Sequence, residues 1–255
     1  MAALGLLAAA CGTTAGEAEG ATATSVEGGT DPATGQLRAA VVVTTGCGAA
    51  PPGEGSGVAL SPTRILTAAH VVAGSTDVSV RLRGDDPIDR SIGRDAEPEP
   101  PTVPARVVAY DTTRDLAVVE LMEEADGLTV PTEDIAIDNL ATGDAGIILA
   151  AGVSGDVPFT VTERTIIEID EVRGTERVRR DGYLLDAATS PGDSGSGLYD
   201  GQGRLVGVLF AVSTDNGRRS WATAGTEVDA FLADQRTQGT FACDPERSRL
   251  ASAGP

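Results

Sequence analysis

The alternation of apolar and polar residues along the chain predicts a protein built mainly from short β-strands. Runs of aliphatic and β-branched residues, each bounded by Gly, Pro, Asp or Ser, are typical of strands. They cover residues 39–44, 57–61, 64–67, 77–82, 105–109, 116–121 and 145–150. Two hairpins are predicted further on, pairing 160–169 with 177–185 and 196–199 with 205–212. Asp200-Gly201-Gln202-Gly203 supplies the glycines that a tight turn needs in the second hairpin.

One helix is expected near the end of the chain, where Thr226 can cap a segment whose Val228, Phe231 and Leu232 share a face. About a dozen strands and a terminal helix, with no alternation of strand and helix, predict an all-β fold of the antiparallel barrel type. Residues 84–104 are rich in Pro, Asp and Arg and are expected to form a surface loop. Residues 12–36 have almost no large apolar side chain, so a flexible tether is expected there.

Composition narrows the range of partners. The chain has a formal net charge of -19, and all 19 of its positive residues are arginine, so we expect no nucleic-acid partner. Leu4-Gly5-Leu6-Leu7-Ala8-Ala9-Ala10-Cys11 is apolar and too short to span a bilayer, and it predicts the core of a secretory signal. The segment resembles a bacterial lipoprotein processing site, which would attach a lipid to Cys11 and place the protein at a membrane. The alternative is a plain signal core with an incidental cysteine.

The three cysteines support export. If Cys11 carries a lipid, Cys47 and Cys243 remain as a pair. A disulfide between them would close nearly the whole domain and would stabilise it by up to about 5 kcal/mol. The alternative is a pair of free thiols in a cytosolic protein.

Three separated motifs carry the candidate chemistry. A serine hydroxyl becomes a good nucleophile only when a base removes its proton, and that base needs an acceptor on its far side. His70 is the single histidine of 255 residues, and Ser194 lies in Gly192-Asp193-Ser194-Gly195-Ser196-Gly197. Asp115 opens an apolar run and is the preferred acceptor. Asp111, in a polar stretch, is the alternative.

Gly192, two residues before Ser194, has a separate expected role. Gly192 allows a turn in which its own N–H and that of Ser194 point at one spot, as an oxyanion hole requires. Each motif alone has a structural explanation: a strand end with a satisfied histidine, a core strand, or a turn. Their occurrence in the order His, Asp, Ser within one all-β chain favours a hydrolase.

With these motifs, roughly residues 37–245 resemble the trypsin/chymotrypsin-like peptidase family. The segment from Gly55-Ser56-Gly57 through Val72-Ala73-Gly74 is similar to the bacterial extracytoplasmic branch. The resemblance implies two six-stranded antiparallel β-barrels with the site between them, flanked by a signal-like segment (1–11), a tether (12–36) and a tail (246–255). It implies His70 as base, Asp115 as its orienting group, Ser194 as nucleophile, and the N–H groups of Gly192 and Ser194 as the oxyanion hole. The implied substrates are extracytoplasmic proteins or peptides, with no cofactor and no metal.

Position relative to Ser194 also predicts a specificity pocket, formed by Ala188, Thr189, Phe210, Ala211, Val212 and Thr223. Because none of these residues is acidic, we expect a small or medium apolar side chain before the cleaved bond. Asp193 is expected to find a local partner rather than a new N-terminus at Val26, since no Arg or Lys precedes Val26.

Two other functions remain open at this stage. The chain can be a protease-fold binding protein without turnover. An esterase is disfavoured, because Ser194 leads into a predicted strand and not into a helix.

Overall fold

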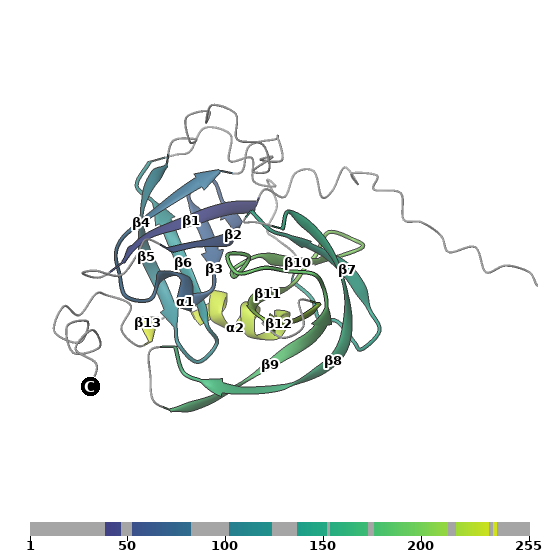
Figure 1. Cartoon of the computed structure of the whole chain (residues 1–255). Helices are drawn as coiled ribbons and strands as arrows, with labels where there is room; N and C mark the ends of the chain where they lie inside the picture. The colour runs from purple at the N-terminus through teal and green to yellow at the C-terminus, as the bar shows by residue number, and fades with distance from the viewer. Residues whose placement is uncertain are drawn as a thin grey trace, which may run out of the picture. The chain divides into compact units, whose positions relative to one another are not determined.

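Two antiparallel sheets of six strands each make up the fold in the computed structural model (Figure 1). The structure describes residues 39–46, 53–82, 102–123, 137–151, 154–172, 176–213 and 218–234, and the backbone of 237–238. These residues belong to one compact unit, Asp31–Pro255. The predicted signal-like segment, tether and tail lie outside the described residues. No helix among the described residues is long and apolar enough to cross a membrane.

The first sheet forms a ring. It contains β1 (Ala39–Gly46), β2 (Gly53–Ser61), β3 (Arg64–Thr67), β4 (Ser75–Leu82), β5 (Val103–Asp111) and β6 (Leu116–Leu121). The strand order is β5-β4-β1-β2-β3-β6, and pairing of β5 with β6 closes it. The short β13 (Thr237–Gln238) adds to β5 in parallel, and the helical turn α1 (Ala69–Val72) connects β3 to β4.

The second sheet is a closed barrel with the strand order β10-β11-β12-β9-β8-β7. Its strands are β7 (Ala145–Leu149), β8 (Asp156–Asp170), β9 (Arg177–Asp186), β10 (Gly197–Asp200), β11 (Leu205–Val212) and β12 (Arg219–Ala224). Helix α2 (Gly225–Asp234) follows β12 directly. The predicted all-β fold of two six-stranded antiparallel barrels with a short C-terminal helix is confirmed.

Strand β12 is the main element that the sequence pattern missed. Its sequence, Arg-Ser-Trp-Ala-Thr-Ala, lacks the β-branched run that indicates a strand, yet it pairs with both β11 and β9 and so completes the barrel. The predicted loop 84–104 is also partly wrong, because β5 begins at Val103 and Pro104 is paired with Ser79 of β4.

Helix α2 begins one residue before the predicted cap. Thr226 therefore lies inside the helix, and the prediction that it caps the helix was wrong. The side-chain oxygen of Asn139 accepts the Thr226 N–H at 3.0 Å, so a distant residue satisfies this part of the helix terminus. Val228 and Phe231 of the predicted apolar face are buried, whereas Leu232 is half-buried.

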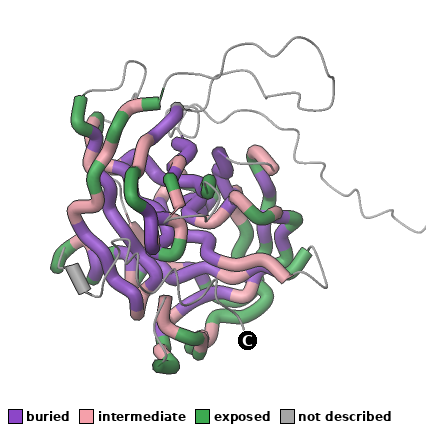
Figure 2. Tube along the Cα trace, turned by 60° about the vertical axis from the view of Figure 1, so that its left-hand side comes forward, coloured by how far each residue is buried: buried purple, intermediate pink, exposed green. Residues whose placement is uncertain are grey.

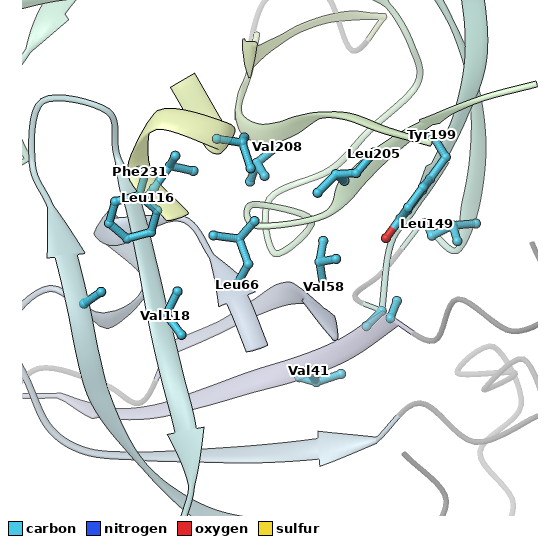
Figure 3. Close-up of a cluster of buried hydrophobic side chains, with 14 residues drawn as sticks. Val41, Val58, Leu66, Leu116, Val118, Leu149, Tyr199, Leu205, Val208 and Phe231 are labelled. Atoms are coloured by element: carbon cyan, nitrogen blue, oxygen red, sulfur yellow. The ribbon is translucent and has the colours of Figure 1, made fainter. Parts of the chain in front are cut away.

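Buried side chains form three clusters, and the buried stretches run through the strands of both sheets (Figure 2). One cluster lies within the first ring and one within the second barrel. The third is shared: Val58 and Leu66 from the first sheet pack with Val208 of the second sheet and Phe231 of α2 (Figure 3). This shared cluster fixes the two barrels against each other and so positions side chains contributed by both.

Candidate active site

His70 lies in α1, the single helical turn between β3 and β4. Ala68, just before the turn, is extended, and the N–H of Ala69 donates to the Asp115 carbonyl at 3.1 Å. Ala68, Ala69 and Val72 are fully buried, while the His70 side chain is 37% exposed. The buried small residues therefore fix the turn and leave the imidazole accessible.

Asp115 lies in the turn between β5 and β6 and points its carboxylate at His70. The His70 N–H donates to Oδ1 at 2.8 Å, and His70 Nδ1 lies 2.9 Å from Oδ2 and 3.1 Å from Oδ1. An ionised carboxylate at this place holds the proton on Nδ1 and leaves Nε2 as the basic nitrogen. Asp115 is 3% exposed and, among the described residues, the only non-glycine with a positive φ, at 55°.

Asp111, the alternative partner for His70, instead shapes the turn. Its Oδ1 accepts the N–H groups of Thr113 (2.8 Å) and Arg114 (2.9 Å), and its Oδ2 pairs with the Arg114 guanidinium at 2.6 Å. Arg114 also donates to Glu227 of α2 at 2.9 Å. The structure therefore brings Asp115, and not Asp111, to the imidazole.

The segment before Ser194 is a tight turn, closed by the Asp193 N–H donating to the Ser190 carbonyl at 3.0 Å. Pro191 stands at the second position of this turn and Gly192, with φ of 99°, at the third. This combination is typical of a type II turn, in which the third residue needs a positive φ. Such a turn sets the direction of the Gly192 N–H, as an oxyanion hole requires.

Asp193 is fully buried beneath this turn. One carboxylate oxygen accepts the Ser190 N–H at 2.8 Å, and the other accepts the Ser154 N–H at 3.3 Å. The carboxylate therefore has the expected local partner in Ser190 and a second, distant backbone partner in Ser154. Val26, the alternative source of a partner, lies outside the described residues.

Ser194 lies close to α1, with Gly55 between them. A Cβ atom built on Gly55 would lie 2.6 Å from a Val71 methyl and 3.0 Å from the Ser194 carbonyl, so Gly55 separates the two segments at close range. The Ser194 hydroxyl donates to the Phe210 carbonyl at 3.3 Å. Within the described part of the chain no hydrogen bond joins this hydroxyl to His70.

Gly195 and Ser56 form close contacts between the first barrel and the serine loop, residues 190–196. The Ser56 N–H donates to the Ser194 carbonyl at 2.7 Å, and the Ser56 hydroxyl donates to the Gly192 carbonyl at 3.4 Å. Gly195 has φ of 92°, and a Cβ there would lie 2.0 Å from the Ser56 carbonyl oxygen. Gly195 was predictable from its motif but Ser56 was not, because the only signal for Ser56 is its place between Gly55 and Gly57.

The predicted pocket residues are only partly brought together. Buried Thr189 shares a 2.7 Å hydrogen bond with Ser220 of β12, a residue that sequence reasoning missed. The Thr223 hydroxyl instead donates to the Arg114 carbonyl at 3.1 Å, so it faces the Asp115 turn. Ala188 is exposed, and Phe210, Ala211 and Val212 form the end of β11.

A second residue that the sequence did not reveal is Arg180 of β9. Its side chain is 2% exposed, and its Nη2 lies 3.6 Å from Asp115 Oδ2. Burial lowers the pKa of the Arg180 guanidinium, and the Asp115 carboxylate opposes that shift. Nothing in the sequence marks this arginine, since Arg177 and Arg179 are also arginines of the same predicted strand.

Some predicted sites cannot be placed. Cys11, Cys47 and Cys243 lie outside the described residues, and the lipidation and disulfide predictions lie there with them. Across the described ranges, no group of three or more His, Cys, Asp or Glu side chains has the geometry of a metal site.

The fold of two six-stranded sheets defines the class of protein, and comparison with known proteins identifies the family. Residues 55–208 match the trypsin-like peptidase domain, and the chain belongs to that family. It is 33% identical over 199 residues to the serine protease Rv3671c of Mycobacterium tuberculosis, covering 74% of this chain and 45% of that protein. The active form of that protease, solved by crystallography, aligns with a TM-score of 0.64 and 26% identity over 83% of this chain and 88% of the solved chain.

A second relative is described as a periplasmic serine protease similar to Do and HhoA, from Haemophilus influenzae. It is 27% identical over 168 residues, which cover 65% of this chain and 32% of that protein. The chain thus spans less than half the length of these curated relatives. The expected membership of the trypsin-like family is confirmed.

Proposed function

We propose that the protein is a serine endopeptidase in which His70, Asp115 and Ser194 form the catalytic triad. The observation that carries the proposal is the double contact of His70 with the buried Asp115 carboxylate, through the backbone N–H at 2.8 Å and Nδ1 at 2.9 Å. This contact leaves Nε2 as the base. Trypsin-like relatives that are serine proteases support the same assignment.

In the proposed reaction Ser194 first rotates away from the Phe210 carbonyl toward His70. His70 takes the hydroxyl proton while the oxygen attacks the peptide carbonyl, and Asp115 stabilises the imidazolium that forms. The N–H groups of Gly192 and Ser194 donate to the oxyanion, an interaction for which each donor contributes about 3–4 kcal/mol to barrier lowering. His70 then protonates the leaving amine, and water hydrolyses the acyl-enzyme.

A fluorophosphonate probe tests the proposal directly, because it labels only an activated serine. We expect wild-type protein to be labelled and to degrade a denatured protein, and Ser194→Ala to do neither. Ser79→Ala, on β4 and away from the site, is the matched control and should behave as wild type. Labelling that persists in Ser194→Ala, or its absence from folded wild-type protein, contradicts the proposal.

One observation favours a second candidate, a binding protein without turnover: the Ser194 hydroxyl is bonded to the Phe210 carbonyl and not to His70. Stopped-flow measurement with an activated ester separates the two. A burst of released alcohol equal to the enzyme concentration supports the acyl-enzyme, whereas no burst in correctly folded protein supports the binding function.

We propose a preference for a small or medium apolar side chain before the cleaved bond. Its support is the Thr189–Ser220 pair, which presents hydroxyl groups and no carboxylate at the predicted pocket, while Thr223 is engaged with Arg114. Ser220→Ala should alter the preference more than Thr223→Ser does. Profiling with a peptide library checks this, and a dominant preference for Arg or Lys refutes it.

We also propose that the protein acts outside the cytoplasm, attached to a membrane through a lipid on Cys11, with a Cys47–Cys243 disulfide. The support is the apolar segment ending at Cys11 and the periplasmic description of one relative. Metabolic labelling with a fatty acid should mark wild type and not Cys11→Ser. Thiol titration of denatured, unreduced protein should find neither Cys47 nor Cys243 free.

A further inference from the structure

Arg180 is a buried cation that reaches from the second barrel to the candidate triad. It lies on β9, while its partners Asp115 and Thr113 lie in the β5–β6 turn of the first barrel. We infer that Arg180 is a positioning residue for the peptidase reaction: it holds Asp115 as a carboxylate that orients the ring, and its own positive charge offsets that negative charge, so that His70 stays unprotonated down to lower pH. This inference rests on the proposed function.

The contacts of the guanidinium fix it in one place. Nη1 donates to the Thr113 carbonyl at 3.1 Å, Nη2 lies 3.6 Å from Asp115 Oδ2, and the guanidinium carbon lies 4.1 Å from the centroid of the Phe210 ring. Arg180 Nε is buried and has no hydrogen-bond partner among the described residues. A buried arginine with an unsatisfied nitrogen is not what stability alone favours, because a well-packed apolar side chain would avoid both costs.

The hairpin of β8 and β9, which carries Arg180, contacts the Asp115 turn at a second point. Glu171, which directly follows β8, accepts a hydrogen bond from the Thr112 hydroxyl. The β8–β9 hairpin therefore contacts two successive residues of the turn, at Thr112 and Thr113, and delivers Arg180 beside the carboxylate. Phe210, whose ring stacks on Arg180, also supplies the carbonyl that accepts the Ser194 hydroxyl.

The charges around Arg180 come from several elements. The turn contributes Asp111, Arg114 and Asp115, helix α2 contributes Glu227, and α1 contributes His70; along the hairpin itself lie Arg179, Asp181 and Glu171. Arg114 is already paired with both Asp111 and Glu227. With His70 neutral, the inner group of Arg180, Arg114, Asp111, Asp115 and Glu227 carries one net negative charge, and removing Arg180 makes it two.

The loss of this positive charge should shift the protonation of His70 in one direction. A second net negative charge beside the ring stabilises the imidazolium and lets His70 take up its proton at higher pH. Asp115 with Arg180 therefore orients the ring as a lone carboxylate would, but attracts the proton less. Activity that depends on neutral His70 should extend further into the acidic range with Arg180 than without it.

The single histidine makes the test direct, because only one imidazole titrates in an NMR experiment. In a Ser194→Ala background, which prevents self-digestion, Arg180→Met should move the midpoint of the His70 titration upward by about one pH unit. Arg180→Lys retains the charge and should stay within about 0.3 unit of the parent. Arg164→Met, which removes the same charge from an ion pair with Asp181 on the outer part of the hairpin, is the matched control and should not move it.

The active protein supplies an independent readout. With Ser194 present, the acidic limb of the kcat/KM profile should shift upward by the same amount in Arg180→Met, with KM little changed, and Arg180→Lys should restore it. An unchanged midpoint in folded Arg180→Met overturns the inference, and so does loss of fold in both Arg180→Met and Arg180→Gln, which would assign a structural role. Failure of the proposed function appears differently, as wild-type protein that is inert at every pH.

Discussion

Replacing Gly195 by alanine should destabilise the fold through both backbone strain and steric overlap, and the two contributions can be measured separately. Three glycines form a graded series for replacement by alanine. Gly195 and Gly143 share nearly the same φ, 92° and 94°, but a Cβ on Gly143 meets nothing within 4 Å. Gly201 also has open space around it and no positive φ.

The magnitudes follow from these differences. Gly143→Ala adds only the cost of a left-handed backbone, about 1–2 kcal/mol. Gly195→Ala adds to this a buried overlap with the Ser56 carbonyl at 2.0 Å, and that carbonyl also accepts the Thr67 hydroxyl at 2.7 Å. Overpacking and a lost buried hydrogen bond bring the total to about 3–5 kcal/mol. Gly201→Ala should lie within about 0.5 kcal/mol of the parent, since it introduces no strain.

The assay is urea unfolding followed by the fluorescence of Trp221, the single tryptophan, in a Ser194→Ala background. Probe labelling of the corresponding variants that retain Ser194 adds a functional readout. Gly195→Ala should label at least about 100-fold more slowly, because it displaces Ser194 and the adjacent oxyanion donors, whereas Gly143→Ala should label normally. If Gly195→Ala and Gly143→Ala lose the same stability, the close approach to Ser56 does not constrain the serine loop and the reasoning fails.

Three further predictions concern carboxylates. Asp115→Asn should lower kcat by about 10⁴-fold, since an amide selects the wrong imidazole tautomer. Asp111→Asn should lower stability but keep kcat within about 10-fold. Equal losses of kcat in the two variants would contradict the assignment of Asp115 as the partner of His70. Asp193→Asn leaves unpaired one of the two N–H groups that the buried carboxylate accepts, so about 2 kcal/mol of stability should be lost together with most probe labelling. The hydrogen bond from Arg164 holds the pKa of Asp181 below its usual value, so this carboxylate stabilises the fold above its unfolded pKa of about 3.9 and loses that effect as pH falls through the folded pKa. Asp181→Asn should therefore lower the free energy of unfolding at pH 7 by less than about 1 kcal/mol and not at pH 2; a larger deficit in acid would refute the sign.

Features encoded within a few neighbouring residues were predictable from the sequence. The bounds of β3, β6 and β11 follow from short apolar runs, and the hairpin turn at Asp200 follows from its glycines, with the Gly203 N–H donating to the Asp200 carbonyl at 3.0 Å. His70 and Asp115 were also predictable as partners, since each lies in its own local motif and the family resemblance links them.

Features that depend on residues distant in the chain were not predictable. Strand β12 is held by pairing on both edges and not by its own propensity. Asn139, 87 residues before Thr226, supplies the hydrogen bond for which we expected a local cap. Arg180 looks like any polar strand residue until β9 is packed against the Asp115 turn, because only the fold brings that carboxylate and the Phe210 ring to it.

The apolar cluster shared by the two barrels also determines how the protein unfolds. Val58, Leu66, Val208 and Phe231 bury one another across the boundary, so separating the halves would expose them all to water. The two barrels should therefore melt in a single calorimetric transition. A chain cleaved between Glu123 and Ile137 should stay together as a non-covalent pair, and neither fragment should keep its structure after the other is removed.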